Sequence, residues 1–280
     1  MTGLESDPTQ LAWLVVMLMS AGLAAGFAAG LFGIGGGFVV VPALLLVFNY
    51  FGVEREIMTH VAIGTSLATI IITSLSSVRA HAKHDAVDFK IIREWAPGLI
   101  MGVMFGLGLA RLMDGQSMKW VFSAGVLLLG LHFIFPILQR KPPVATEMPH
   151  GPVMVGISTF LGGFSALLGI GGGTIAILVM TAHGRSIHQA VATAAGFGVV
   201  IAIPGAIGFV LLGLGQDTLP YGSVGYVNFL AVAAITAMSF LTAPLGAKVA
   251  HSLDGVMLKR VFGIYLVATS LTVLRDSFVV

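Results

Sequence analysis

The sequence predicts an all-α polytopic membrane protein with two inverted-topology repeats of about five helical segments each. Of its 280 residues, 57% are hydrophobic and only 9% are charged, whereas soluble domains carry about 25% charged residues. Apolar segments of about 20 residues recur along the chain, and each is long enough to cross a hydrocarbon core of roughly 30 Å. Two nearly identical glycine runs, at 32–37 and 168–173, interrupt these segments at matching places. They predict short, glycine-broken helices that meet near the membrane midplane.

The first repeat, residues 1–139, opens with the apolar segment 11–32. No basic region and no small-residue cleavage site precede it, so we expect a retained span rather than a cleaved signal peptide. Segment 38–50 begins directly after the first glycine run and is too short to cross the bilayer. Segment 57–79 is a full-length span that ends where basic residues begin.

Segments 94–112 and 118–138 complete the first repeat. The former contains three glycines at intervals of four residues, a spacing that lets two membrane helices pack closely. These glycines are Gly98, Gly102 and Gly106. The latter segment follows Asp114 and Gly115, which we interpret as a helix-starting turn.

The second repeat, residues 152–280, follows a polar, proline-rich linker at 140–151, and the two repeats are expected to form one integral membrane domain. The order of long and short segments is the same as in the first repeat. The expected helical segments are 152–168, 174–183, 188–213, 226–248 and 258–276.

Three sequence matches in the same order indicate an internal duplication. Besides the glycine runs, residues 59–65 resemble residues 189–195. Residues 114–122 match residues 254–262, with Asp, Gly, Lys, Val and Phe in register. The offsets are 136, 130 and 140 residues, and a duplication is the simplest account of them.

The number of segments and the charges both predict that the repeats are inverted. A glycine-tipped hairpin crosses the membrane twice or not at all, and three spans follow it, so each repeat makes an odd number of crossings. The stretch 79–93 carries four Lys and Arg residues, whereas its counterpart, 211–228, carries none. The positive-inside rule therefore places the first stretch in the cytoplasm and the second outside, with both termini external.

The glycine runs are the strongest candidate for a binding site. The short helices that follow them would measure roughly 20 Å and 15 Å at 1.5 Å per residue, so they would end inside the membrane. A helix N-terminus presents unpaired N–H groups and about half a positive charge. Two such ends that converge suit an anion. The alternative is that the glycines only allow close helix packing, but a run of four glycines in five residues, present in both repeats, favours a ligand-facing turn.

Hydroxyl groups near the glycine runs are further candidates for contact with an anion. Membrane Ser and Thr residues also commonly bond their own helix backbone, and Thr174 would serve equally as a helix N-cap. The predicted substrate-binding residues are Gly33, Gly35, Gly36, Gly37, Gly169, Gly171, Gly172, Gly173, Thr174, Thr65, Ser66 and Thr193.

Several classes of chemistry are disfavoured by the residues present. All twelve Asp and Glu residues lie in loops or at helix ends, which disfavours a carboxylate proton relay or a cation site. Coupling by histidine, or no coupling at all, stays open. The chain has no cysteine, its histidines lack metal-ligand spacing, and no serine, zinc or aspartate protease motif is present. We therefore expect no catalytic residues, no metal and no cofactor, and the small net charge of +2 predicts no nucleic-acid partner.

The paired Gly-Ile-Gly-Gly-Gly motif, the first copy followed by Phe38-Val39-Val40-Val41-Pro42, resembles the TauE/SafE sulfite exporter family of bacterial and archaeal permeases. The resemblance covers nearly the whole chain in length, repeat structure and motif position. The second copy departs from the pattern, because no proline follows at the position that matches Pro42. Membership implies transport of sulfite, sulfonates or related small sulfur-containing anions, most commonly export.

The predicted function is thus a secondary transporter, and an exporter, of a small sulfur-containing anion such as sulfite or an organosulfonate. Alternating access would expose the anion bound at the paired glycine breaks. An anion channel, or an importer of sulfonates or other small organic anions, is the alternative. The expected location is the inner membrane as a multi-pass protein, and the expected partners are the anion, the lipid bilayer and, as a possible assembly, a second copy in a homodimer.

Overall fold

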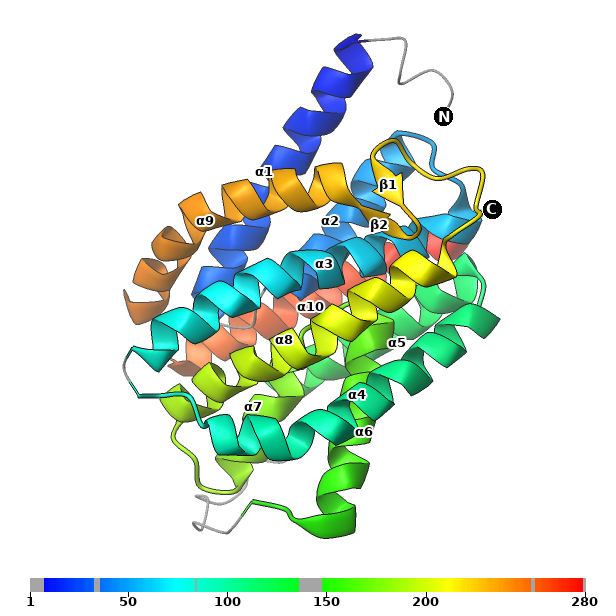
Figure 1. Cartoon of the computed structure of the whole chain (residues 1–280). Helices are drawn as coiled ribbons and strands as arrows, with labels where there is room; N and C mark the ends of the chain where they lie inside the picture. The colour runs from blue at the N-terminus through cyan, green and yellow to red at the C-terminus, as the bar shows by residue number, and fades with distance from the viewer. Residues whose placement is uncertain (1–7, 33–35, 84, 136–147, 253–254, 279–280) are drawn as a thin grey trace.

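The computed structural model describes residues 8–32, 36–83, 85–135, 148–252 and 255–278, and these residues form an almost entirely helical bundle (Figure 1). The elements in chain order are α1 (Pro8–Phe32), α2 (Gly37–Tyr50), α3 (Arg55–Ala82), α4 (Phe89–Leu112), α5 (Gly115–Ile134), α6 (Gly151–Leu168), α7 (Gly173–Ala182), α8 (Ile187–Leu212), β1 (Ser223–Val224), β2 (Val227–Asn228), α9 (Phe229–Ser252) and α10 (Gly255–Phe278).

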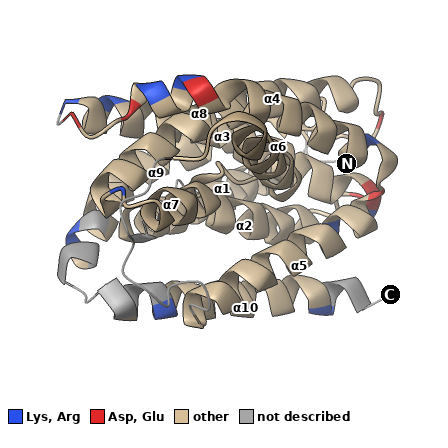
Figure 2. Cartoon of the chain, turned by 90° about the horizontal axis from the view of Figure 1, so that it is seen from below, with Lys and Arg blue, Asp and Glu red and all other residues tan. Residues whose placement is uncertain are grey.

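Among the described residues, seven helices are long and apolar enough to cross a membrane, which confirms the prediction of a polytopic all-α membrane protein. Figure 2 shows most charged residues toward the ends of the helices, with uncharged segments between them. Helices α2 and α7 have only 14 and 10 residues, so they are the short segments expected after the glycine runs. Helix α3 is the most buried of the seven long helices, because 61% of its apolar 18-residue stretch is buried inside the protein.

The main helix pairs join residues that are distant in the sequence. Helix α1 packs along α9, α4 along α6, α5 along α10, and α3 along α8. Small residues let two of these pairs approach closely: a Cβ atom on Gly26 would lie 2.4 Å from the Ser239 Cα of α9. One on Gly102 would lie 2.0 Å from the Thr159 carbonyl oxygen of α6. The predicted packing role of the glycine ladder on α4 agrees with this geometry.

Capping residues shift the starts of two helices from the predicted positions. Asp88 accepts a hydrogen bond from the Ile91 backbone N–H at 3.1 Å, so α4 begins at Phe89 rather than near residue 94. Asp114 accepts one from the Ser117 N–H at 2.8 Å, so α5 begins at Gly115 rather than 118. The predicted end of that segment, at 138, lies outside the described residues.

The prediction of a helix from residue 226 is wrong at its start, because a β-hairpin precedes α9. Strands β1 and β2 pair antiparallel, with Ser223 opposite Asn228 and Val224 opposite Val227. Gly225 turns the chain with a φ of 54°. A Cβ atom at this position would also lie 2.0 Å from the Val210 carbonyl oxygen, so the turn fits only as glycine.

Candidate functional site

Each short helix starts from a glycine in the left-handed conformation. Gly36 has a φ of 78° before α2, and Gly172 has a φ of 68° before α7. Side-chain-bearing residues rarely adopt such angles, whereas glycine does so at little cost. Each glycine carbonyl accepts a hydrogen bond from the first turn that follows, at 2.9 Å from Val39 and at 3.1 Å from Ala176. In the described residues, the glycine directly before each short helix therefore has the same left-handed conformation.

The two glycine turns lie against each other inside the bundle. A Cβ atom on Gly37 would lie 2.7 Å from the Gly169 carbonyl oxygen and 3.2 Å from the Ile170 Cα. Gly169 has a φ of 64° and ends α6, and a Cβ there would lie 3.1 Å from the Ile63 Cα of α3. The structure thus brings together two segments that the sequence separates by more than a hundred residues.

The start of α7 is polar although it is buried among apolar helices. The first N–H groups of a helix have no acceptor within it, and they carry the positive end of the helix dipole. Next to these groups lies Thr174, which is 2% exposed and whose Oγ1 has no hydrogen-bond partner among the described residues. No heavy atom of the described residues lies within 4 Å of a Cβ placed on Gly173.

Ser165, on the last turn of α6, is a site residue that the sequence analysis missed. Its side chain is fully buried, and within the described part of the chain its Oγ has no hydrogen-bond partner. A Cβ atom on Gly172 would lie 3.1 Å from this oxygen, so the hydroxyl faces the second glycine turn. Its place one helical turn before Gly169 is a signal by which the sequence could have identified it.

Two buried hydroxyls without a partner at one helix start are unusual, because buried polar groups are normally hydrogen-bonded. Both belong to the second glycine run and its neighbours. Such groups can donate hydrogen bonds to an oxyanion, as can the free N–H groups of the first turn. The described residues of this arrangement supply hydrogen-bond donors and no carboxylate. That combination suits an anion.

The other predicted hydroxyls have partners within the protein. Ser66 on α3 donates a hydrogen bond at 2.8 Å to the Gly169 carbonyl oxygen and so holds the second glycine run in place. Thr65 accepts one at 2.9 Å from the Asn228 N–H, which ties α3 to the β-hairpin. Ser66 therefore contacts the second glycine run directly, and Thr65 contacts the β-hairpin.

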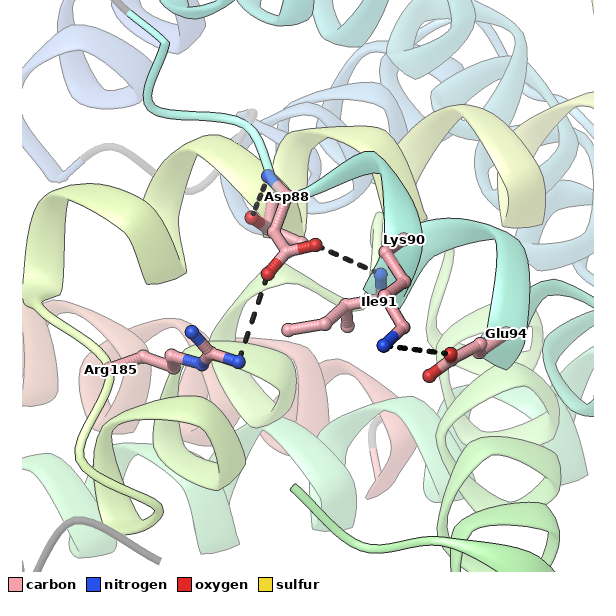
Figure 3. A network of polar contacts seen from close by, with 6 residues as sticks. Asp88, Lys90, Ile91, Glu94 and Arg185 are labelled. Atoms are coloured by element: carbon pink, nitrogen blue, oxygen red, sulfur yellow. Dashed lines mark hydrogen bonds and ion pairs between the residues drawn. The ribbon is translucent and has the colours of Figure 1, made fainter. Parts of the chain in front are cut away.

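Asp88, at the start of α4, takes part in a separate polar network (Figure 3), and Thr193 forms a hydrogen bond with its backbone. The Thr193 Oγ1 accepts this hydrogen bond from the Asp88 N–H at 2.9 Å. The Asp88 carboxylate lies 3.8 Å from the Arg185 guanidinium, and Lys90 lies 3.9 Å from Glu94 on the same helix. The structure therefore places the Thr193 hydroxyl at a contact between the loop before α4 and α8.

The remaining glycines differ in their surroundings. Gly171 packs against neighbouring helices, since a Cβ there would lie 3.2 Å from Ile70 Cγ2 and 3.4 Å from the Gly198 Cα. Gly33 and Gly35 lie outside the described residues. The described part of the site is therefore asymmetric, with its unpartnered hydroxyls on α6 and α7.

Comparison with known proteins matches residues 18–273 to the family described as "Sulfite exporter TauE/SafE". A "Probable membrane transporter protein" of Haemophilus influenzae is 34% identical over 258 residues, which cover 92% of this chain and 97% of that protein. Proteins with the same description from Methanocaldococcus jannaschii and Bacillus subtilis are 29% and 25% identical, and each alignment covers 90% of this chain and 93% and 94% of the relative. No solved structure matches the chain.

Proposed function

Because the chain belongs to the sulfite exporter TauE/SafE family of membrane transporters, we propose that it is a secondary transporter that exports a small sulfur-containing anion such as sulfite or an organosulfonate. The observation that supports this most directly is the contact between the two glycine turns, with two unpartnered buried hydroxyls beside the start of α7. Sulfite and sulfonate groups present several oxygen acceptors at one centre, which suits several converging N–H and O–H donors.

The charges at the site favour an anion over a cation. Each helix start contributes roughly half a positive charge, and the first turns of both α2 and α7 contain no acidic residue. Export of an anion from a cell with a negative interior releases about 2.3 kcal/mol per charge for each 100 mV. The membrane potential alone can therefore drive the proposed export.

We also propose that the transporter works by alternating access between two inverted repeats. The helix pairs support this, because they follow a two-fold relation between the repeats. This relation exchanges α1 with α6 and α4 with α9, so the packed pair α1–α9 corresponds to the packed pair α6–α4. The same operation maps α5 onto α10 and α3 onto α8, which are themselves paired. The proposed location is the inner membrane, with Arg79 and Lys83 on the cytoplasmic side; a homodimer stays a prediction.

The hydroxyls beside the second glycine turn provide the test of the binding site. Ser165→Ala and Thr174→Val remove an unpartnered buried hydroxyl with little change in volume, so both variants should fold. Each is expected to weaken sulfite or sulfoacetate binding by about 10- to 100-fold, the loss that follows from one hydrogen bond to a charged group. Isothermal titration calorimetry on purified protein measures the dissociation constant directly, with taurine and sulfate as further ligands.

Ser158→Ala is the matched control, because Ser158 is also buried on α6 but donates its hydroxyl to the Met154 carbonyl at 2.8 Å. It should bind the anion as the parent protein does. Unchanged binding in both site variants would move the anion site away from the glycine turns. Binding without saturable transport in proteoliposomes, combined with steady single-channel current, would favour a channel over a carrier.

A further inference from the structure

A cavity of about 360 Å³ lies away from the glycine turns, at the end of α3 where the chain enters that helix. It is lined by the first turns of α3, the last turn of α4, the turn before α5, the end of α8 and the segment that follows it. Its polar lining comes from Glu56, His60, Arg111, Asp114, Gln216 and Tyr226. The proposed topology places this end of the molecule outside the cell, because the stretch 211–228 carries no Lys or Arg.

His60 is the buried member of this lining, with 5% of its surface exposed. Its Nε2 lies 3.1 Å from the Ala110 carbonyl oxygen, an atom that can only accept a hydrogen bond. The Nε2 atom must therefore carry the proton of the neutral ring, which leaves Nδ1 with a free lone pair. Nδ1 has no hydrogen-bond partner among the described residues, so its lone pair is not engaged by another group there.

Polar and charged groups line the cavity around His60. Glu56, Met113 and Asp114 lie around the cavity together with the ring, in addition to Ala110. The charged groups that face the cavity are Glu56 from α3, Arg111 from α4 and Asp114 from the turn before α5. Hydrogen bonds from the Ser117 hydroxyl and N–H hold the pKa of Asp114 below its usual value, so this carboxylate is ionised wherever histidine titrates.

His60 is also connected to the proposed anion site through α3. Its ring lies against the ring of Tyr226, with the centroids 5.0 Å apart, and the Tyr226 carbonyl oxygen occupies the place beside Gly64 where a Cβ would be. Two residues further along the hairpin, Asn228 bonds Thr65, and the next residue of α3, Ser66, holds the Gly169 carbonyl. His60 and Ser66 are six residues apart, or roughly 9 Å along the helix.

We propose that this cavity is a proton-binding site, in which Nδ1 of His60 takes up a proton from the external solution and its occupancy controls the rate of anion transport. The part that concerns transport rests on the proposed function. The proton adds to the Nδ1 lone pair, while the Nε2–H bond to Ala110 is kept. Two carboxylates and one guanidinium leave the cavity with a net negative charge, and the imidazolium cancels it. An anion that passes this end of the protein then meets less repulsion, so transport becomes faster as the external pH falls.

The test uses proteoliposomes loaded with a sulfonate such as methanesulfonate, whose own charge does not change over the range in which histidine titrates. Transport by the parent protein is expected to rise about two- to tenfold as the external pH falls from about 8 to 5. His60→Gln keeps a donor for the Ala110 carbonyl but cannot be protonated, so it should lose this dependence and keep the slow rate of high pH. His188→Gln, an exposed histidine at the start of α8, is the matched control and should retain the dependence.

Nuclear magnetic resonance of ¹³C-labelled histidine gives a second readout that needs no transport. The imidazole signal absent from His60→Gln identifies His60, and in the parent protein it should shift as the pH is lowered. A signal that does not shift, or pH dependence that persists in His60→Gln, would overturn the proposal. A signal that titrates in a protein that neither binds nor transports any sulfur anion would overturn the proposed function and leave the proton site standing.

Asp114→Asn is a second variant that tests the proposal if His60→Gln does not fold. Asparagine preserves the helix cap but removes the negative charge that favours the protonated ring. The pH midpoint of transport should then move downward by about 0.2 to 0.7 pH unit, the range expected for a solvent-exposed charge pair. An unchanged midpoint would contradict the assignment of the pH dependence to this cavity.

Discussion

At Gly37 the backbone of one glycine turn lies against the backbone of the other. The nearest neighbours of an added Cβ atom would include the Gly169 carbonyl oxygen at 2.7 Å, which cannot swing aside as a flexible side chain can. At Gly173, at the start of the other short helix, an added Cβ atom would have no heavy atom of the described residues within 4 Å. Gly37 therefore allows the close approach of the two turns, whereas Gly173 borders the space in which the anion is proposed to bind.

Alanine at each of these positions should have a different consequence. Gly37→Ala is expected to destabilise the protein by about 1–3 kcal/mol, as overpacking does in close-packed interiors. Gly173→Ala should fold normally, because alanine favours a helix more than glycine does, but its methyl group should occupy part of the anion space and weaken binding. Thermal unfolding in detergent and calorimetric titration with sulfite distinguish the two effects. Equal losses of stability would contradict the proposed division of roles.

At the residue scale the sequence predicted the glycine turns but not the partners of the hydroxyls. The runs are recognisable because four glycines in five residues, present in both repeats, are a local pattern that favours a turn inside an apolar segment. Whether Thr65, Ser66 or Thr193 faces a ligand depends on atoms at Asn228, Gly169 and Asp88, each more than a hundred residues away. One sequence does not encode such pairings in its local pattern, and for the same reason the unpartnered Ser165 was missed.

The β-hairpin is the element that local sequence patterns failed to predict. Its strands have two residues each, which is too short for any periodicity to show. Asn228 holds it together instead: its side-chain amide donates to the Tyr221 carbonyl and the Ser223 hydroxyl, and its Oδ1 accepts from the Ala231 N–H. The helices, in contrast, were predicted within a few residues, because their length and apolar character are local properties.

Asn228→Ala should therefore destabilise the protein well beyond an ordinary surface substitution. The side chain is 1% exposed, and its loss leaves several buried polar groups without partners, which predicts a cost of roughly 2–4 kcal/mol. Asn49→Ala, at an exposed position near the end of α2, is the control and should change the stability by less than about 0.5 kcal/mol. Thermal unfolding of both variants measures the difference. Similar stabilities would mean that the hairpin is held by its backbone alone.

At the scale of the whole molecule, two polar contacts join the proposed repeats at opposite ends of the bundle. At the basic end, Arg185 lies 3.8 Å from Asp88. At the end near the His60 cavity, the Thr218 hydroxyl donates a hydrogen bond at 2.8 Å to the Glu54 carboxylate. Both contacts are partly exposed, so each contributes little to stability. If the repeats move against each other during transport, however, each contact must break when its own side opens.

Breaking one contact should accordingly bias the protein toward opening on that side. Because the chain contains no cysteine, a single Gly173→Cys substitution gives a thiol reporter at the proposed site without background, and no heavy atom of the described residues lies within 4 Å of a Cβ at this position. In this background Arg185→Gln should increase labelling by a membrane-impermeant maleimide applied from the cytoplasmic side by about two- to fivefold, the effect of an exposed ion pair. Thr218→Val should increase labelling from the external side instead. Each variant is the control for the other, since a fixed pore, unlike an alternating-access carrier, would show the same change from both sides.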